Sequence, residues 1–173
     1  MLQQALRRLA LFAATPALLV GAAPARADVV PVPPVPPIAP IVAPVPAAVL
    51  MSQVVTMTNQ QRNANGCGQL AVDRELTLAS IRQSTYMAQT GLFTHVWRNG
   101  STFVTRARAA GYPQPAGENI AWGYPTAAAV LAAWMASPRH RDNILNCGAR
   151  SIGTGVVYGL NGLPYFTEVL GWD

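Results

Sequence analysis

The residues best suited to chemistry in this sequence are Glu118, in the segment GENIAWG, and His140, in the segment SPRHRDN. Both residue types are scarce, because the 173 residues include only seven acids and two histidines. Glu118 precedes the apolar residues 120–122, where an acidic side chain that faces solvent is unexpected. A carboxylate and an imidazole that are held in place could bind a metal ion or form an acid/base pair, and the second histidine, His95, is a third candidate.

The elements that must position these side chains are mainly helices, which are predicted before the last two strands. Apolar residues recur at three- and four-residue spacing from Ala47 to about Gly66, which predicts a helix. Capping and stop signals predict four more helices. These run from Asp73 to Gly91, from Ser101 to Gly111, from Pro125-Thr126 onward, and over 137–145 with Pro138 in the first helical position.

Strands are predicted late in the chain. Residues 152–158 and 164–170 alternate or run apolar on either side of Asn161-Gly162, a strong hairpin-turn signal. Residues 118–122 are predicted as a third strand. Helices followed by an antiparallel sheet indicate an α+β domain.

The N-terminal 27 residues are predicted to be a secretory signal peptide. Arg7 and Arg8 are followed by an apolar run with a proline, and Ala25-Arg26-Ala27 is an A-x-A cleavage site. A retained membrane anchor is the alternative, although the run is shorter than the ~20 apolar residues that a span prefers. Residues 28–46 hold eight of the fifteen prolines and are predicted to be a semi-rigid linker, or alternatively an arm that binds a partner. The folded domain is therefore expected at 47–173.

Charge and cysteine content narrow the function classes. All twelve basic residues are arginine, and three of them lie in the first 27 residues, so nine remain against seven acids. This weak, scattered balance argues against a nucleic-acid partner. In an oxidising compartment, Cys67 and Cys147 most simply form one disulfide, and a reactive thiol is the alternative.

Several motifs occur in the order found in one protein family. They begin with Asn59-x-x-Arg62 and Phe93-Thr94-His95, continue through residues 117–123 and 134–145, and end with Gly153-x-Gly155 and residues 165–168. Together they resemble the CAP superfamily of cysteine-rich secretory, antigen-5 and pathogenesis-related proteins, in its short bacterial, SCP-like extracellular form. The resemblance implies an α-β-α sandwich with a central antiparallel sheet.

The resemblance also implies a cleft lined by two histidines and two glutamates, able to hold a divalent metal in some members. Carried over by position, the cleft residues are His95, Glu118 and His140, which would also be the metal ligands, with zinc as the most plausible ion. The second glutamate position is Ser137 here, so the four-ligand set is incomplete. Trp122, beside Glu118, could line an apolar part of the cleft.

Structural explanations remain open for the same residues. Glu118 could pair with an arginine such as Arg106 or Arg141, and Ser137 could simply cap a helix. Glu168 stands where similar domains commonly have glutamine.

The expected function is a secreted, lipid- or small-ligand-binding domain without enzymatic activity. It would be extracellular or associated with the cell surface, without stable membrane insertion once the signal is cleaved. Two alternatives stand beside it: a metal-assisted protease or cell-wall hydrolase with Glu118 as base, and a surface adhesion module.

Overall fold

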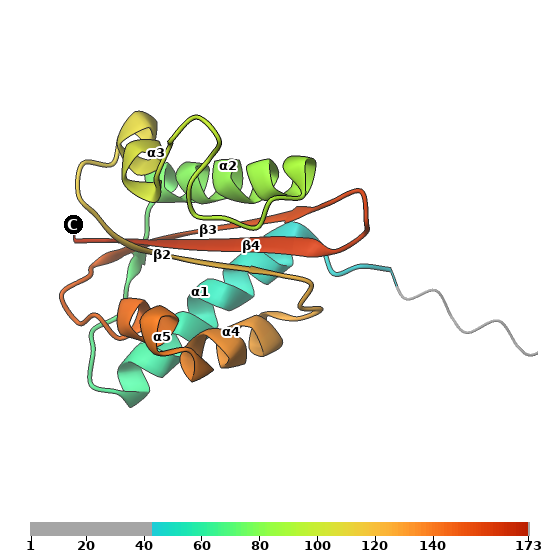
Figure 1. Cartoon of the computed structure of the whole chain (residues 1–173). Coiled ribbons are helices and arrows are strands. Elements are labelled where there is room, and N and C mark those ends of the chain that lie inside the picture. The colour runs from blue at the N-terminus through green and yellow to red at the C-terminus, as the bar shows by residue number, and fades with distance from the viewer. Residues whose placement is uncertain (1–42, 173) are drawn as a thin grey trace, which may run out of the picture. The chain divides into compact units, whose positions relative to one another are not determined.

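A computed structural model describes residues 43–172 as a four-stranded sheet between two layers of helices (Figure 1). The predicted signal peptide and residues 28–42 of the predicted linker lie outside the described residues. Helices α2 and α3 cover one face of the sheet, and α1, α4 and α5 cover the other. The predicted α-β-α sandwich is thus confirmed. Within residues 43–172, no helix is both long and apolar enough to cross a membrane.

The last two strands follow all of the described helices, as predicted, whereas β2 lies between α3 and α4. The helices are α1 (Ala47–Ala64), α2 (Arg74–Thr90), α3 (Phe103–Ala110), α4 (Ala127–Ala136) and α5 (Pro138–Ile144). The strands are β1 (Ala71–Val72), β2 (Pro115–Trp122), β3 (Ser151–Tyr158) and β4 (Pro164–Gly171).

The sheet has the order β1-β3-β4-β2. Strands β2, β3 and β4 pair antiparallel, so the predicted antiparallel centre is present. The two-residue strand β1 pairs parallel with β3 and makes the sheet mixed. It was not predicted because two residues are too short to show an alternating pattern.

Local capping explains most helix boundaries. The Asp73 carboxylate accepts a hydrogen bond from the Leu76 amide at the start of α2, and Gly91 ends that helix in the left-handed region at φ 69°. Helix α3 is capped by Thr102 rather than by Ser101, which was the predicted cap. Ser137 occupies the cap position of α5, but its hydroxyl makes no capping hydrogen bond, so the capping explanation for this serine is wrong.

Helix α2 lies directly on the backbone of β3. A Cβ atom at Gly153 or Gly155 would overlap backbone atoms of α2. The Ser80 and Ser84 hydroxyls donate hydrogen bonds of 2.9 Å to the carbonyls of these two glycines. The Gly-x-Gly motif therefore permits the close approach of one helix layer to the sheet.

The opposite layer contains the largest apolar cluster. Leu50 and Val54 from α1 pack with Trp134 from α4 and Phe166 from β4, all of them almost fully buried. The Trp134 indole also donates a hydrogen bond of 3.1 Å to the carbonyl of Ile120 on β2. This packing fixes α4, and α5 directly after it, against the strand that carries Glu118.

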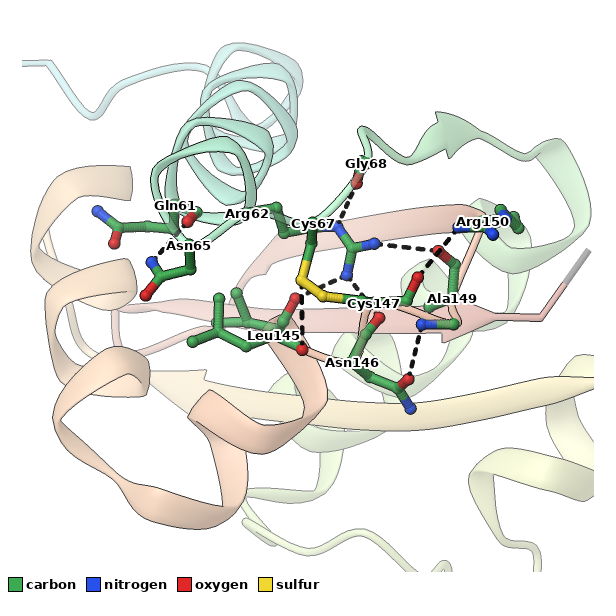
Figure 2. The surroundings of a disulfide bond; sticks show 12 residues. Gln61, Arg62, Asn65, Cys67, Gly68, Leu145, Asn146, Cys147, Ala149 and Arg150 are labelled. Carbon is green, nitrogen blue, oxygen red and sulfur yellow. Dashed lines mark hydrogen bonds between the residues drawn. A yellow bond between two sulfur atoms is a disulfide. The ribbon is translucent and has the colours of Figure 1, made fainter.

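A disulfide joins Cys67, after α1, to Cys147, after α5 (Figure 2). The predicted pairing is therefore present. Beside it lies the fully buried guanidinium of Arg62. It donates hydrogen bonds of 2.8–3.0 Å to four backbone carbonyls, those of residues 68, 144, 146 and 149. The disulfide and this arginine thus tie the end of α5 to α1.

Candidate functional site: two pockets that meet at His140

The first pocket lies between α5, the start of β2 and the segment before α3, with a volume of about 650 Å³. It brings together three residues predicted to form the cleft: His95, Glu118 and His140. Three apolar side chains, four polar or charged side chains and one glycine form the remaining walls. These residues are Val96, Thr102, Phe103, Ala116, Gly117, Arg139, Asp142 and Asn143.

Glu118 is anchored on β2 by two partners. Its Oε2 lies 2.6 Å from Nη2 of Arg106, and its Oε1 lies 2.9 Å from Nδ1 of His95. The side chains of Glu118 and Arg106 are almost inaccessible to solvent, at 1% and 3%. A buried ion pair with hydrogen bonds holds the carboxylate in place. Of the two arginines suggested from the sequence, Arg106 is the partner observed.

His95 and His140 differ in which ring nitrogens remain free to bind a ligand. The His95 ring is half exposed, and its Nδ1 is engaged with Glu118, so Nε2 is the ring nitrogen left for a ligand. No hydrogen bond to the His140 ring is formed by the residues that the structure describes. Burial, and secondarily the charge of His95, lowers the pKa of His140 below 6.5. The His140 imidazole is therefore largely neutral at pH 7 and free to accept or donate one hydrogen bond.

This arrangement bears on metal binding. In the described part of the chain, no group of three or more His, Cys, Asp or Glu side chains is placed to hold a metal ion. Each oxygen of Glu118 already accepts one hydrogen bond, so a metal ion would have to share this carboxylate with the Arg106 guanidinium and the His95 ring. The two imidazoles, His95 and His140, are the remaining candidates of the predicted set.

The second pocket, of about 500 Å³, contains the other two predicted cleft residues, Trp122 and Ser137, and shares His140 with the first. Its walls are mainly aromatic. The other lining residues are Phe93, Ile120, Ala121, Tyr124, Ala133 and Trp134. The structure thus divides the predicted cleft into an ionisable pocket and an aromatic pocket. We refer to them as the first pocket and the aromatic pocket.

Two asparagines connect the first pocket to the interior. The Asn143 amide on α5 donates to Asn119 Oδ1 at 2.8 Å and to the Glu118 carbonyl at 3.1 Å. Asn119 in turn donates to the His140 carbonyl at 3.2 Å. A Cβ at Gly117 would overlap the Asn143 side chain, so the glycine allows α5 to approach β2. These contacts hold the backbone of α5 beside Glu118.

Glu168 does not reach either pocket. It lies fully buried on β4, where it accepts hydrogen bonds from the Thr58 hydroxyl at 2.8 Å and from the Asn119 amide at 3.5 Å. Burial raises its pKa to about 7, although both hydrogen bonds and the charge of Arg62 act in the opposite direction. Its partner Thr58 lies 110 positions away in the sequence, so no local signal could have identified the contact.

The residues that sequence reasoning missed are Asn143 and the apolar walls around Val96 and Phe103. Asn143 belongs to the recognised motif after Pro138, but its role depends on the pairing of α5 with β2. The exposed Phe93 belongs to the motif that ends at His95, whereas the exposed Val96 follows that motif and had no sequence signal of its own.

Comparison with known proteins places this geometry in context. Residues 55–169 match the model of a family described as "CAP: Cysteine-rich secretory protein family". An uncharacterized protein of Bacillus subtilis, YkwD, is 36% identical over 117 residues, which are 66% of this chain and 45% of YkwD. This chain therefore spans less than half the length of that relative.

Two solved structures share the fold. An extracellular protein containing an SCP domain from Bacillus anthracis superposes with a TM-score of 0.68 at 26% identity, covering 73% of this chain and 41% of that chain. An outer surface protein from Borrelia burgdorferi gives a TM-score of 0.64 at 19% identity, covering 69% of this chain and 90% of that chain. At that identity, the second similarity concerns the fold alone.

Proposed function

The chain belongs to the cysteine-rich secretory protein (CAP) family, and from this premise we propose that it is a secreted, non-enzymatic domain that binds a small lipid-like ligand in the first pocket. Secretion is supported by the predicted signal peptide, by the disulfide and by the similarity to the extracellular protein of Bacillus anthracis. Attachment to the cell surface is compatible with the same observations.

The observation that carries the binding proposal is the composition of the first pocket. Val96, Phe103 and Ala116 offer apolar surface, while the neutral His140 ring and the Nε2 of His95 offer hydrogen bonds. Apolar walls combined with convergent polar groups are typical of small-ligand sites. A molecule with an apolar body and one polar end matches this combination.

The engagement of Glu118 favours binding over hydrolysis. A general base needs a carboxylate that the substrate can reach, but the Glu118 side chain is almost inaccessible to solvent and both of its oxygens are hydrogen-bonded, one to Arg106 at 2.6 Å and the other to His95 at 2.9 Å. The His95–Glu118 hydrogen bond is the one feature that a hydrolase would share. Metal binding would use the two imidazoles, His95 and His140, and we place it second to direct ligand binding.

Radiolabelled palmitic acid and cholesterol, incubated with the purified full chain, test the proposal. We expect saturable binding of at least one probe, weakened at least tenfold by Val96→Asp, which places a charge on the apolar wall. Val49→Asp is the matched control, because Val49 on α1 is similarly exposed (41% against 47%) and lines no described pocket. Failure of both probes to bind would contradict the proposal.

The same protein preparations test whether His95 and His140 bind zinc. Zinc content after dialysis is measured in the wild type, His95→Ala and His140→Ala. Equal content in all three proteins would remove both histidines as ligands.

A further inference from the structure

Large apolar side chains in the aromatic pocket are unusually exposed to solvent. Phe93 is 50% exposed and Trp122 is 48% exposed, and Tyr124 lines the same pocket. Trp122 stacks on Tyr165 through one face, with ring centroids 6.3 Å apart. Contiguous exposed apolar side chains on a folded domain often mark an interaction site.

The polar groups of this pocket include one indole N–H donor, on Trp122, and two hydroxyls, on Tyr124 and Ser137, that can both donate and accept. The indole N–H of Trp122 and the hydroxyls of Tyr124 and Ser137 make no hydrogen bond within residues 43–172. The Trp134 indole, by contrast, is already used by the Ile120 carbonyl. No Asp, Glu, Asn, Gln, Lys or Arg side chain of the described residues lines this pocket, and its remaining polar side chain is His140.

This chemistry selects a ligand that is apolar, uncharged and rich in acceptors. A proline-rich segment has these properties, because proline has no N–H while its carbonyl remains free. In the polyproline II conformation the backbone makes no internal hydrogen bonds, and such segments dock in aromatic grooves. A sugar fits less well, because no carboxylate or carboxamide of the described residues lines this pocket to bind several hydroxyl groups at once.

The described part of the chain already shows the same contact elsewhere. The Tyr158 hydroxyl donates a hydrogen bond of 2.7 Å to the carbonyl of Val45, which stands between Pro44 and Pro46. Val45 also packs against the core cluster around Leu50. An aromatic hydroxyl therefore holds a proline-flanked carbonyl on this domain in at least one place.

We propose that the aromatic pocket is a docking site for an extended, uncharged, proline-rich segment of a partner protein. Phe93, Trp122 and Tyr124 would supply the stacking surface, and the free Trp122 N–H and Tyr124 O–H would donate to its carbonyls. The inference goes beyond the proposed function, because it concerns the neighbouring pocket and a polypeptide rather than a small ligand.

Fluorescence anisotropy with a labelled, end-blocked peptide tests this. The peptide has the sequence PVPPVPPIAPIV, that of residues 31–42, and the full chain is titrated into it. We expect a saturable signal with a Kd below about 1 mM, the range of a weak specific complex. Trp122→Ala should weaken it at least fivefold. Trp172→Ala is the matched control, because Trp172 is 40% exposed, lines no described pocket and should leave the Kd unchanged.

Tyr124→Phe removes only a hydroxyl and keeps the ring, so it guards against an effect on folding. It should weaken peptide binding about two- to tenfold at an unchanged Tm. Absence of peptide binding, insensitivity to Trp122→Ala and Tyr124→Phe, or tighter binding of chitotriose would each overturn the proposal. Val96→Asp should leave peptide binding intact, and Trp122→Ala should leave palmitate or cholesterol binding intact. The two proposals can therefore fail separately.

Discussion

At the scale of single residues, two buried acids in this domain have opposite surroundings. Glu118 faces the Arg106 guanidinium directly, at 2.6 Å. Glu168 has only the Thr58 hydroxyl and the Asn119 amide as direct partners among the described residues, and Arg62 acts on it without a hydrogen bond. A carboxylate in a low-dielectric interior without a direct cation is costly in its charged form. Burial consequently raises the pKa of Glu168 to about 7, and this predicts how stability changes with pH.

We expect Glu168 to make the folded protein less stable as the pH rises. In the unfolded chain this carboxyl loses its proton near pH 4.5, whereas in the folded protein it keeps the proton to about pH 7. The stability it contributes is fully present below pH 4.5 and is lost as the pH rises through 7. The change corresponds to roughly 3 kcal/mol in the free energy of unfolding.

Glu168→Gln tests this, because glutamine has the same shape, can accept from Asn119 and cannot ionise. Urea unfolding at several pH values between about 4 and 8 should show the variant matching the wild type at low pH and exceeding its stability at the upper end of the range. The difference between the two proteins is the informative quantity, since the lowered pKa of His140 acts in the opposite direction over part of this range. Asp142→Asn, an exposed acid, serves as the control. A constant difference across the pH range would contradict the prediction.

At the scale of elements, the sequence predicted the helix boundaries that are set by residues close together in the chain. Asp73 and Gly91 delimit α2 by local capping and backbone geometry, and both were recognised in advance. Strand β1 and the partner of Glu168 depend on pairings across many residues, for which no local pattern exists. Ser137 shows the opposite error. Its residue type suits capping and it occupies the cap position of α5, but its hydroxyl makes no capping hydrogen bond.

The packing of α2 on β3 gives a prediction at this scale. Gly155→Ala should destabilise the protein by about 2–3 kcal/mol, because the new methyl group would overlap the backbone near Ser80 and push the helix away from the sheet. Gly68→Ala is the matched control, because a Cβ there meets nothing within 4 Å. Urea unfolding at neutral pH measures both variants. Equal stabilities would show that the helix can move without cost.

At the scale of the whole molecule, the candidate site depends on the fold more than on any motif. His95 and Glu118 are 23 positions apart, and their hydrogen bond forms only because the segment before α3 lies beside β2. The scarcity of acids and histidines and the local surroundings of Glu118 singled these residues out, but only the family resemblance predicted that they share one cleft. The division into two pockets arises because the His140 ring lies between them, which follows from the position of α5.

The position of α5 depends in turn on two links to α1: the Cys67–Cys147 disulfide and the carbonyl bonds of Arg62 (Figure 2). The disulfide closes a loop across a separation of 80 residues, which the chain-entropy model values at about 4–5 kcal/mol. Arg62 makes its hydrogen bonds to backbone carbonyls, so these remain possible when the disulfide is reduced. The reduced protein should therefore fold but be less stable.

Thermal unfolding with and without dithiothreitol tests this dependence. We expect reduction to lower the Tm by roughly 10–20 °C, with a thiol assay confirming two free cysteines. The double variant Cys67→Ser/Cys147→Ser should have a Tm near that of the reduced wild type and should not respond to the reductant. Arg62→Met in the oxidised protein should also lower the Tm, because four carbonyls lose their donor. An unchanged Tm after complete reduction would mean that α1 and α5 are held together without the disulfide, and that Arg62 and the core around Trp134 suffice to position His140.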